Sequence, residues 1–258
     1  MLKAQSNTKI FNVAFLNSTN FSLLICSSAA TSSIQQHLMK HYSVDLSKKW
    51  DYENGFYLTC ETGRIGKFLN HLEIYKKIVD LPGDVLEFGV YKGTSFIRLL
   101  SFRDLLEHQH SRKVIGFDIF GKFPDDLNLD SDRKFVAQFE GAGGYGISKE
   151  ELESHLERKK TTNYQLIAGD IRFTINEFLE KNPALKIALL HIDVDVYEPT
   201  KVILESLWDK VVKGGILMLD DYGTVAGETK AVDEFFEGQD VVVHKPKYYH
   251  IPSYIVKT

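Results

Sequence analysis

Four aspartates stand in two short clusters, each placed directly after an apolar run of the sequence. One cluster holds Asp193 and Asp195, and the other holds Asp220 and Asp221. Two parallel strands joined by a helix present their carboxyl ends at the same edge of a sheet, so we expect the four carboxylates to meet there. Carboxylates this close repel one another unless a cation or protons compensate their charge. The spacing therefore predicts a cation site.

The chemistry of the donors suggests which cation and which base. Oxygen ligands without a cysteine or a histidine pair suit a hard cation such as Mg²⁺ rather than zinc. We assign Asp193, Asp220 and Asp221 to the metal and Asp195 to the role of general base. A cation eases ionisation of an alcohol hydroxyl while a nearby carboxylate accepts the proton. In the alternative, these acids cap loops and helices at a solvated rim. His191 lies inside the first apolar run, where a buried, hydrogen-bonded side chain is expected.

A second group of residues could bind a small ligand at the same edge. Gly89 and Gly93 form a turn after an apolar run, and the helix expected from Thr94 offers free backbone amides to an anionic group. Asp118 and Asp170 follow the next two strands, where they could accept hydrogen bonds from a ribose and from an adenine amino group. The alternatives are a tightly packed turn, a solvated acid at Asp118 and a helix cap at Asp170. The GxGxxG pattern is absent, which argues against a dinucleotide.

These residues must be positioned by alternating strands and helices. Expected strands span 84–88, 113–117, 164–168, 186–192, 216–219, 241–244 and 249–256, and expected helices span 65–79, 94–107, 148–160 (capped by Ser148), 171–181, 200–212 and 230–236. Helices between strands require right-handed crossovers and a parallel sheet. The link 245–247 is long enough only for a hairpin, so the final strand should be antiparallel. We predict a doubly wound, mostly parallel, seven-stranded α/β fold.

Composition limits the classes of protein. The 258 residues are 43% hydrophobic and 26% charged with a net charge of -4, so we expect neither nucleic acid nor membrane as a partner. Cys26 and Cys60 form no CxxC pair, and this favours a reduced, cytoplasmic protein. The apolar stretches 13–16 and 21–26 are separated by Asn and Ser residues. They are too short for a membrane span, and we expect a buried strand or a docking segment there.

Two regions show no regular pattern. We treat residues 1–60 as an N-terminal extension, serving as a lid or a dimer contact, in front of a single domain at 61–258. Residues 119–147 form a long segment that ends in the glycine-rich run 141–146. Loops of this length in a compact domain are usually functional or disordered, so we expect a mobile lid over the acceptor pocket.

Three motifs resemble the macrocin O-methyltransferase family. They are Leu86 to Gly93, the run His191-Ile-Asp-Val-Asp-Val-Tyr197, and Gly214-Gly215 through Asp220-Asp221-Tyr222. The resemblance covers approximately Thr62 to the C-terminus. Members of this family are Mg²⁺-dependent class I methyltransferases with a Rossmann-like sheet. They use S-adenosylmethionine (SAM) to methylate hydroxyls of sugars or deoxysugars in natural-product and glycan pathways, and a homodimer is expected by the same resemblance.

The resemblance implies a role for each matched residue. SAM would be contacted by Thr62, Glu87, Gly89, Tyr91, Thr94, Ser95, Asp118, Asp170, Ile171 and Asp193. The metal would be bound by Asp193, Asp220 and Asp221, with Asp195 as the base. The sequence thus predicts a SAM- and Mg²⁺-dependent O-methyltransferase whose substrate is a small sugar or glycoside.

Three alternatives have distinct signatures. A catechol-type O-methyltransferase would favour an aspartate-asparagine pair at the fifth strand and a lysine base after the fourth. An NAD(P)-dependent oxidoreductase would be expected to contain the GxGxxG pattern, which this sequence lacks. A non-catalytic SAM-binding module would leave the four aspartates unexplained. Tight SAM binding with no response to metal would favour the last of these.

Overall fold

The computed structural model describes residues 44–258, and the structural statements that follow concern this part of the chain. The strand or docking segment expected at 13–16 and 21–26, with most of the N-terminal extension, lies outside the described residues. Within them, no helix combines the length and the apolar character needed to cross a membrane.

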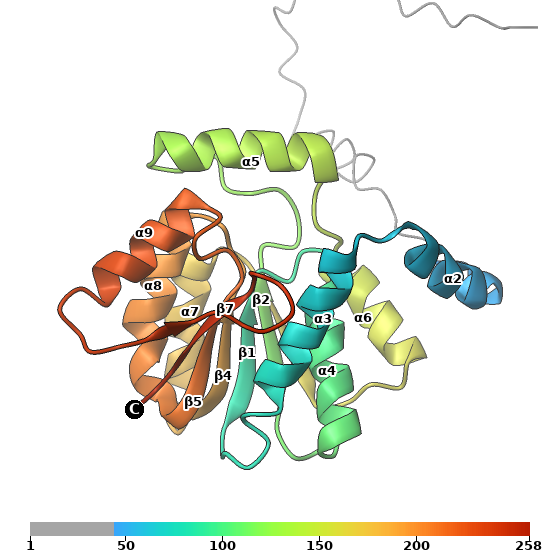
Figure 1. Cartoon of the computed structure of the whole chain (residues 1–258), viewed down its shortest axis with the longest axis horizontal. Coiled ribbons are helices and arrows are strands. Elements are labelled where there is room, and N and C mark those ends of the chain that lie inside the picture. Colours follow the sequence, from blue (N-terminus) through green and yellow to red (C-terminus); the bar gives the residue numbers. More distant parts are fainter. Residues whose placement is uncertain (1–43) are drawn as a thin grey trace, which may run out of the picture. The chain divides into compact units, whose positions relative to one another are not determined.

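A seven-stranded sheet forms the centre of the described region (Figure 1). Its strands are β1 (Asp84–Phe88), β2 (Val114–Asp118), β3 (Tyr164–Ala168), β4 (Ile187–Ile192), β5 (Val211–Leu219), β6 (Val243–His244) and β7 (Ser253–Val256). Their order is β3-β2-β1-β4-β5-β7-β6. The first five are mutually parallel, and β7 runs antiparallel to both β5 and β6. The predicted doubly wound sheet with an antiparallel final strand is confirmed.

Helices cover both faces of this sheet. The helices of the described region are α2 (Lys49–Thr59), α3 (Thr62–Tyr75), α4 (Thr94–Leu106), α5 (Asp130–Gly143), α6 (Lys149–Arg158), α7 (Ile171–Lys181), α8 (Tyr197–Leu207) and α9 (Ala226–Phe235), with single 3₁₀ turns η1 (Leu46–Lys48) and η2 (Trp208–Lys210). Successive side chains of a strand point to opposite faces. Leu86 and Phe88 therefore join a core with α7, α8 and α9, whereas Val85 joins a second core with α3, α4 and α6.

Several boundaries differ from the expected ones. The predicted helix at 200–212 is wrong at both ends, because α8 starts at Tyr197 and the chain is already extended in β5 from Val211. Val211 is paired with Ile187 of β4. An apolar run of this kind fits a buried helix or a buried strand equally well, and the β-branched valines favour the strand. The cap predicted at Ser148 is confirmed, since its hydroxyl accepts a hydrogen bond from the Glu151 N–H at 3.1 Å.

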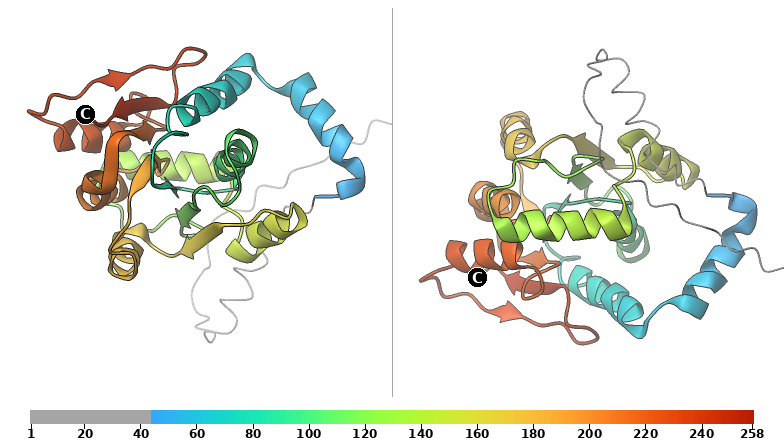
Figure 2. Two further views of the ribbon diagram at one scale, coloured as in Figure 1. Left: turned by 90° about the horizontal axis from the view of Figure 1, so that it is seen from below. Right: turned by 90° about the horizontal axis from the view of Figure 1, so that it is seen from above.

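The region expected to be one long loop, 119–147, contains the 14-residue helix α5. Figure 1 and Figure 2 show α5 lying across the end of the sheet, apart from the two helical layers. It is attached there through Asp132, which is buried and accepts a hydrogen bond from the Tyr197 N–H at 2.8 Å. Val136 of α5 packs with Leu127 and Val196 in a small separate core. The expectation of a structureless segment was wrong in this part.

Candidate functional site

A cavity of about 780 Å³ opens at the carboxyl edge of the parallel strands. Each of five strands contributes to it at its end: Gly89 follows β1, Asp118 ends β2, Asp170 follows β3, Asp193 follows β4 and Asp220 follows β5. The volume is within the range of small-molecule sites. The two groups of residues that the sequence placed at this edge therefore share one cavity.

Most of the predicted site residues belong to the cavity wall. Those that line it are Gly89, Tyr91, Thr94, Ser95, Asp118, Asp170, Ile171, Asp193, Asp195, Asp220 and Asp221. Two others do not line it. Thr62 is exposed as the first residue of α3, and Glu87 is fully buried, with Oε1 3.2 Å from Nδ1 of His191. Glu87 therefore lies behind the cavity wall, beside His191, which is buried and paired as expected.

Gly89 sits where the turn after β1 meets the loop after β4. Its φ of +93° is unfavourable for residues with a side chain, and a Cβ built there would lie 1.7 Å from the carbonyl oxygen of Asp193. Only glycine permits this approach. The turn and the first aspartate of the acidic group are consequently in direct backbone contact.

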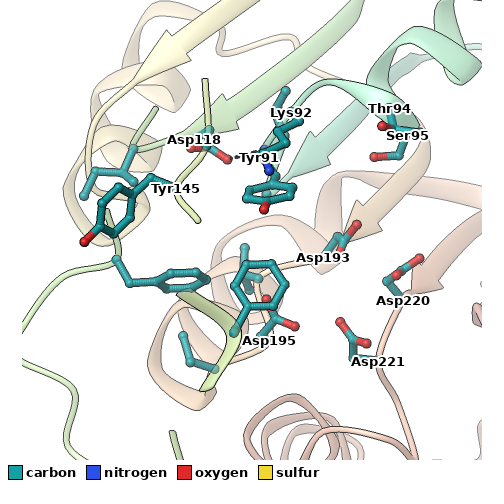
Figure 3. Close-up of a pocket in the computed structure, with 18 of the residues that line it drawn as sticks. Tyr91, Lys92, Thr94, Ser95, Asp118, Tyr145, Asp193, Asp195, Asp220 and Asp221 are labelled. Carbon is teal, nitrogen blue, oxygen red and sulfur yellow. Dashed lines mark hydrogen bonds between the residues drawn. The ribbon is translucent and has the colours of Figure 1, made fainter. Parts of the chain in front are cut away.

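Asp118 organises the turn on the opposite wall of the cavity (Figure 3). Its carboxylate accepts hydrogen bonds from the backbone N–H groups of Tyr91, at 2.8 Å, and of Phe120. Burial raises the pKa of Asp118, and these two hydrogen bonds oppose that rise. Tyr91 and Phe120 both have positive φ angles, 52° and 53°, which the two bonds help to hold. The Tyr91 hydroxyl in turn donates to the carbonyl of Gly143, at the end of α5.

Asp170 is the N-cap of α7, as the capping alternative predicted. Its carboxylate accepts a hydrogen bond from the Arg172 N–H at 2.9 Å and pairs with the Arg172 guanidinium. The same guanidinium pairs with Asp126 at 2.7 Å. Asp170 therefore connects the wall of the cavity to the segment that leads into α5.

The acidic group is brought together as expected. Carboxylate oxygens of Asp193, Asp220 and Asp221 lie within 4.8 Å of one another, and Figure 3 shows the three side chains around one space. Burial, followed by the charge of Asp220, raises the pKa of Asp193 well above its usual range. Burial acts on Asp220 too, but His191, His71 and Lys67 outweigh it and hold the pKa of Asp220 well below normal. An all-oxygen set of one buried and two partly buried carboxylates fits a hard divalent cation.

Asp195 lies beside this group with a strained backbone. Its φ of +64° is uncommon for a residue other than glycine, and such conformations concentrate at functional sites. Burial and then the charge of Asp221 raise the pKa of Asp195 well above its usual range. The result is a carboxylate that takes up a proton more readily than an ordinary aspartate, directly on the cavity wall.

Sequence reasoning missed the contribution of α3. The ammonium of Lys67 pairs with Oδ2 of Asp220, and His71, one turn further, is fully buried facing the same aspartate. Burial disfavours the charged lysine, but Asp220 and Asp193 raise its pKa overall. The sequence did show two polar residues, four positions apart, on a helix face that also buries Ile74. That spacing alone does not show that both residues contact Asp220.

Asn70 fixes α3 to the loop before β7. Its Nδ2 donates to the carbonyls of Tyr249, at 2.9 Å, and Ile251, at 2.8 Å, and its Oδ1 accepts from the Tyr248 N–H at 3.0 Å. Ile251 also lines the cavity. One amide side chain therefore sets both the position of α3 and part of the cavity wall.

Comparison with known proteins gives a consistent result. A family model described as macrocin-O-methyltransferase (TylF) matches residues 36–246. A demethyldecarbamoylnovobiocin O-methyltransferase of Streptomyces niveus is 32% identical over 162 residues, 60% of this chain and 59% of that enzyme. An 8-demethyl-8-(2,3-dimethoxy-alpha-L-rhamnosyl)-tetracenomycin-C 4'-O-methyltransferase of Streptomyces olivaceus is 30% identical over 149 residues, 55% of this chain and 54% of that enzyme. The chain thus spans less than two thirds of the length of these relatives.

A solved structure shares the fold. The calicheamicin methyltransferase CalS11 superposes with a TM-score of 0.63 at 22% identity, covering 93% of this chain and 98% of that one. The sheet order and the antiparallel β7 are those of class I methyltransferases. The family model covers most of the chain, including all three motifs on which the resemblance was based. The chain belongs to the macrocin-O-methyltransferase family.

Proposed function

We propose that this protein transfers the methyl group of SAM to a hydroxyl of a sugar or glycoside, with the help of a divalent cation. The observation that carries the proposal is the meeting of five strand ends in one cavity, which brings a glycine turn together with a group of three carboxylates. Family membership supports O-methyl transfer, and the name of the S. olivaceus relative includes a rhamnosyl compound.

SAM would occupy the side of the cavity formed by β1, β2 and β3. The free amides at the start of α4, by Thr94 and Ser95, suit the carboxylate of its methionine part. The oxygens of Asp118 each keep a lone pair after binding the Tyr91 and Phe120 amides, so they can still accept the ribose hydroxyls. Asp170 and Ile171 would border the adenine.

The carboxylates would handle the acceptor. A divalent cation such as Mg²⁺, held by Asp193, Asp220 and Asp221, would favour ionisation of the acceptor hydroxyl. Asp195 removes the proton of that hydroxyl, and its raised pKa improves it as a base near neutrality. The oxygen then bonds to the methyl carbon while the bond from carbon to sulfur breaks, which leaves S-adenosylhomocysteine as a neutral thioether. The role of the surrounding chain is to align these atoms and exclude water.

The remainder of the proposal concerns the surroundings of the acceptor. Phe123, Phe139 and Tyr145, all from the segment 119–147, give the cavity an aromatic wall, so we retain this segment as the lid. Residues 61–258 would be the catalytic domain, and the extension before them a lid or dimer contact. A homodimer follows from the family resemblance. A reducing cytoplasm, without nucleic acid or membrane as a partner, accords with the net charge of -4 and the lack of a CxxC pair.

Calorimetry and turnover together test this proposal. We would titrate SAM into the wild type, Asp195→Asn and Asp220→Asn, and assay each on nucleotide sugars and sugar-bearing natural products with Mg²⁺ or EDTA. Asp195→Asn should keep SAM binding and lose turnover by about 10²–10⁴-fold, the usual contribution of a general base. Asp220→Asn should keep SAM binding and lose the response to Mg²⁺. Asp240→Asn, which changes an exposed acid, is the control. Unchanged turnover after Asp220→Asn or after EDTA would overturn the mechanism.

A further inference from the structure

Three buried polar atoms converge behind the cavity, between α3, β4 and β5. They are Nε2 of His71, Nε2 of His191 and Oδ1 of Asp220, and none of them has a hydrogen-bond partner within the described residues. All three side chains are almost completely buried. Buried polar atoms are nearly always satisfied, so a set of three that face one another requires an explanation.

Their spacing differs from that of hydrogen bonds. Oδ1 of Asp220 lies 3.5 Å from Nε2 of His191 and 3.6 Å from Nε2 of His71, whereas N–H···O bonds measure about 2.7–3.2 Å. Ligand atoms at about 2.0–2.1 Å from a tetrahedral zinc ion stand about 3.3 Å apart, close to the observed separations. The three atoms form one group within 4.8 Å of each other. The two distances from Asp220 are those of ligands around a shared ion.

The surroundings prepare these side chains for ligation. Nδ1 of His191 faces the buried Oε1 of Glu87 at 3.2 Å, and a carboxylate in this position fixes the tautomer that leaves Nε2 free to bind a metal. The His71 ring meets His191 edge-on, with ring centroids 5.6 Å apart and an interplanar angle of 77°. The second oxygen of Asp220 is occupied by Lys67, so its first oxygen remains available. His191 and Asp220 are thus oriented by polar neighbours, whereas Nδ1 of His71 has no hydrogen-bond partner among the described residues.

We propose that His71, His191 and Asp220 form a buried binding site for a borderline divalent transition cation such as Zn²⁺. Two imidazoles and one carboxylate suit such an ion, while Mg²⁺ prefers oxygen ligands alone. The site is separate from the carboxylate group at Asp193 and Asp221 but shares Asp220 with it. A bound ion would join α3 to β4 and β5 and hold Asp220 in place. This site does not depend on the proposed methyl transfer.

Cobalt provides a direct readout of the site that does not require activity. The full chain, stripped with a chelator, is titrated with Co²⁺ while visible absorption is recorded, and the metal content is measured after dialysis. With the carboxylate group at Asp193 and Asp221 saturated by Mg²⁺, the wild type should bind one Co²⁺ per chain. The absorption bands should be those of a four-coordinate site made of two imidazoles, one carboxylate and a water molecule. Zn²⁺ should displace this Co²⁺, whereas excess Mg²⁺ should not. Zn²⁺ should also raise the temperature of unfolding, because it binds the folded state.

Variants locate the ion. His71→Ala should abolish the absorption bands and the thermal shift by Zn²⁺, whereas Asp193→Asn should retain both. His108→Ala/His110→Ala removes two exposed histidines whose rings lie 5.3 Å apart, and it is the control for binding at the surface. Should His71→Ala fail to fold, the competition between Co²⁺, Zn²⁺ and Mg²⁺ in the wild type still decides the question.

Four outcomes would overturn the proposal. They are a wild type without the cobalt bands, displacement of Co²⁺ by Mg²⁺, equal Co²⁺ binding by His71→Ala, and loss of the bands in the surface variant. A water molecule or a shared proton between the imidazoles would give the first of these results. None of them bears on the Asp195→Asn test of methyl transfer, so failure of the zinc site and failure of the proposed function are distinguishable.

Discussion

Gly89→Ala should be the most damaging single-methyl change in the cavity. The substituted residue would need a φ of +93°, which costs an L-residue about 1–2 kcal/mol. Its Cβ would also lie 1.7 Å from the Asp193 carbonyl oxygen, about half of a normal contact distance of roughly 3.5 Å. Overpacking of this kind costs about 1–3 kcal/mol, so we expect a total loss of about 2–5 kcal/mol in the free energy of unfolding. Because relief of the clash displaces Asp193, affinity for SAM and for Mg²⁺ should fall together.

Two other glycines allow the cost of the positive φ angle to be measured separately from the cost of the steric clash. Gly144 has a positive φ of 71° but open space where a methyl group would be added, so Gly144→Ala should show only the backbone cost of about 1–2 kcal/mol. Gly121 has neither a positive φ nor a neighbour within 4 Å, and Gly121→Ala should stay within about 0.5 kcal/mol of the wild type. The three variants are compared by urea unfolding with equal m-values and by calorimetry with SAM. If Gly89→Ala lost no more stability than Gly144→Ala, the close approach to Asp193 would be refuted as its cause.

Two further predictions concern the acidic group. Lys67→Met should tighten Mg²⁺ binding by about tenfold or more in calorimetry, because the ammonium competes for Asp220 and unit charges a few ångströms apart interact by roughly 2–4 kcal/mol near a protein surface. Lys76→Met, an exposed change just after α3, serves as the comparison, and weaker binding by Lys67→Met would mean that the lysine supports the metal. Burial raises the pKa values of Asp193 and Asp221, so both carboxyls take up protons at higher pH than free aspartate, and protons compete with the metal. As the pH is lowered, the Mg²⁺ affinity should therefore begin to fall at a higher pH than it would for carboxyls with the ordinary aspartate pKa of about 3.9. A fall confined to that ordinary range would contradict the raised pKa values.

Elements with a strong local pattern were predictable from the sequence. The strands β1 and β3 and the helix α7 were expected at the bounds they have, because an apolar period of two or of 3.6 is bounded there by glycine, proline or a capping aspartate. The carboxyl-edge rule then placed Asp193 and Asp220 together without further information. These predictions depend only on residues close together in the sequence and on the rule that parallel strands end at the same edge of the sheet.

Other parts depend on contacts that no local pattern encodes. The helix α5 is polar and rich in glycine at its end, and its burial relies on Asp132 meeting the Tyr197 amide, 65 positions away. Lys67 and Asp220 are 153 positions apart, so the counter-charge of the acidic group was invisible from either cluster. The run at Val211 was ambiguous for a different reason: an apolar segment between two elements can extend either of them.

The side-chain amide of Asn70 couples the loop at Ile251 to the part of α3 that carries Lys67. It holds the backbone at Ile251, which forms part of the cavity surface, and it stands one helical turn from Lys67, whose charge faces Asp220. A movement of this loop would therefore change both the shape of the cavity wall and the position of the Lys67 charge. Changes near residues 248–251 would thus be felt electrostatically as well as sterically, even though that loop carries no ligand of its own.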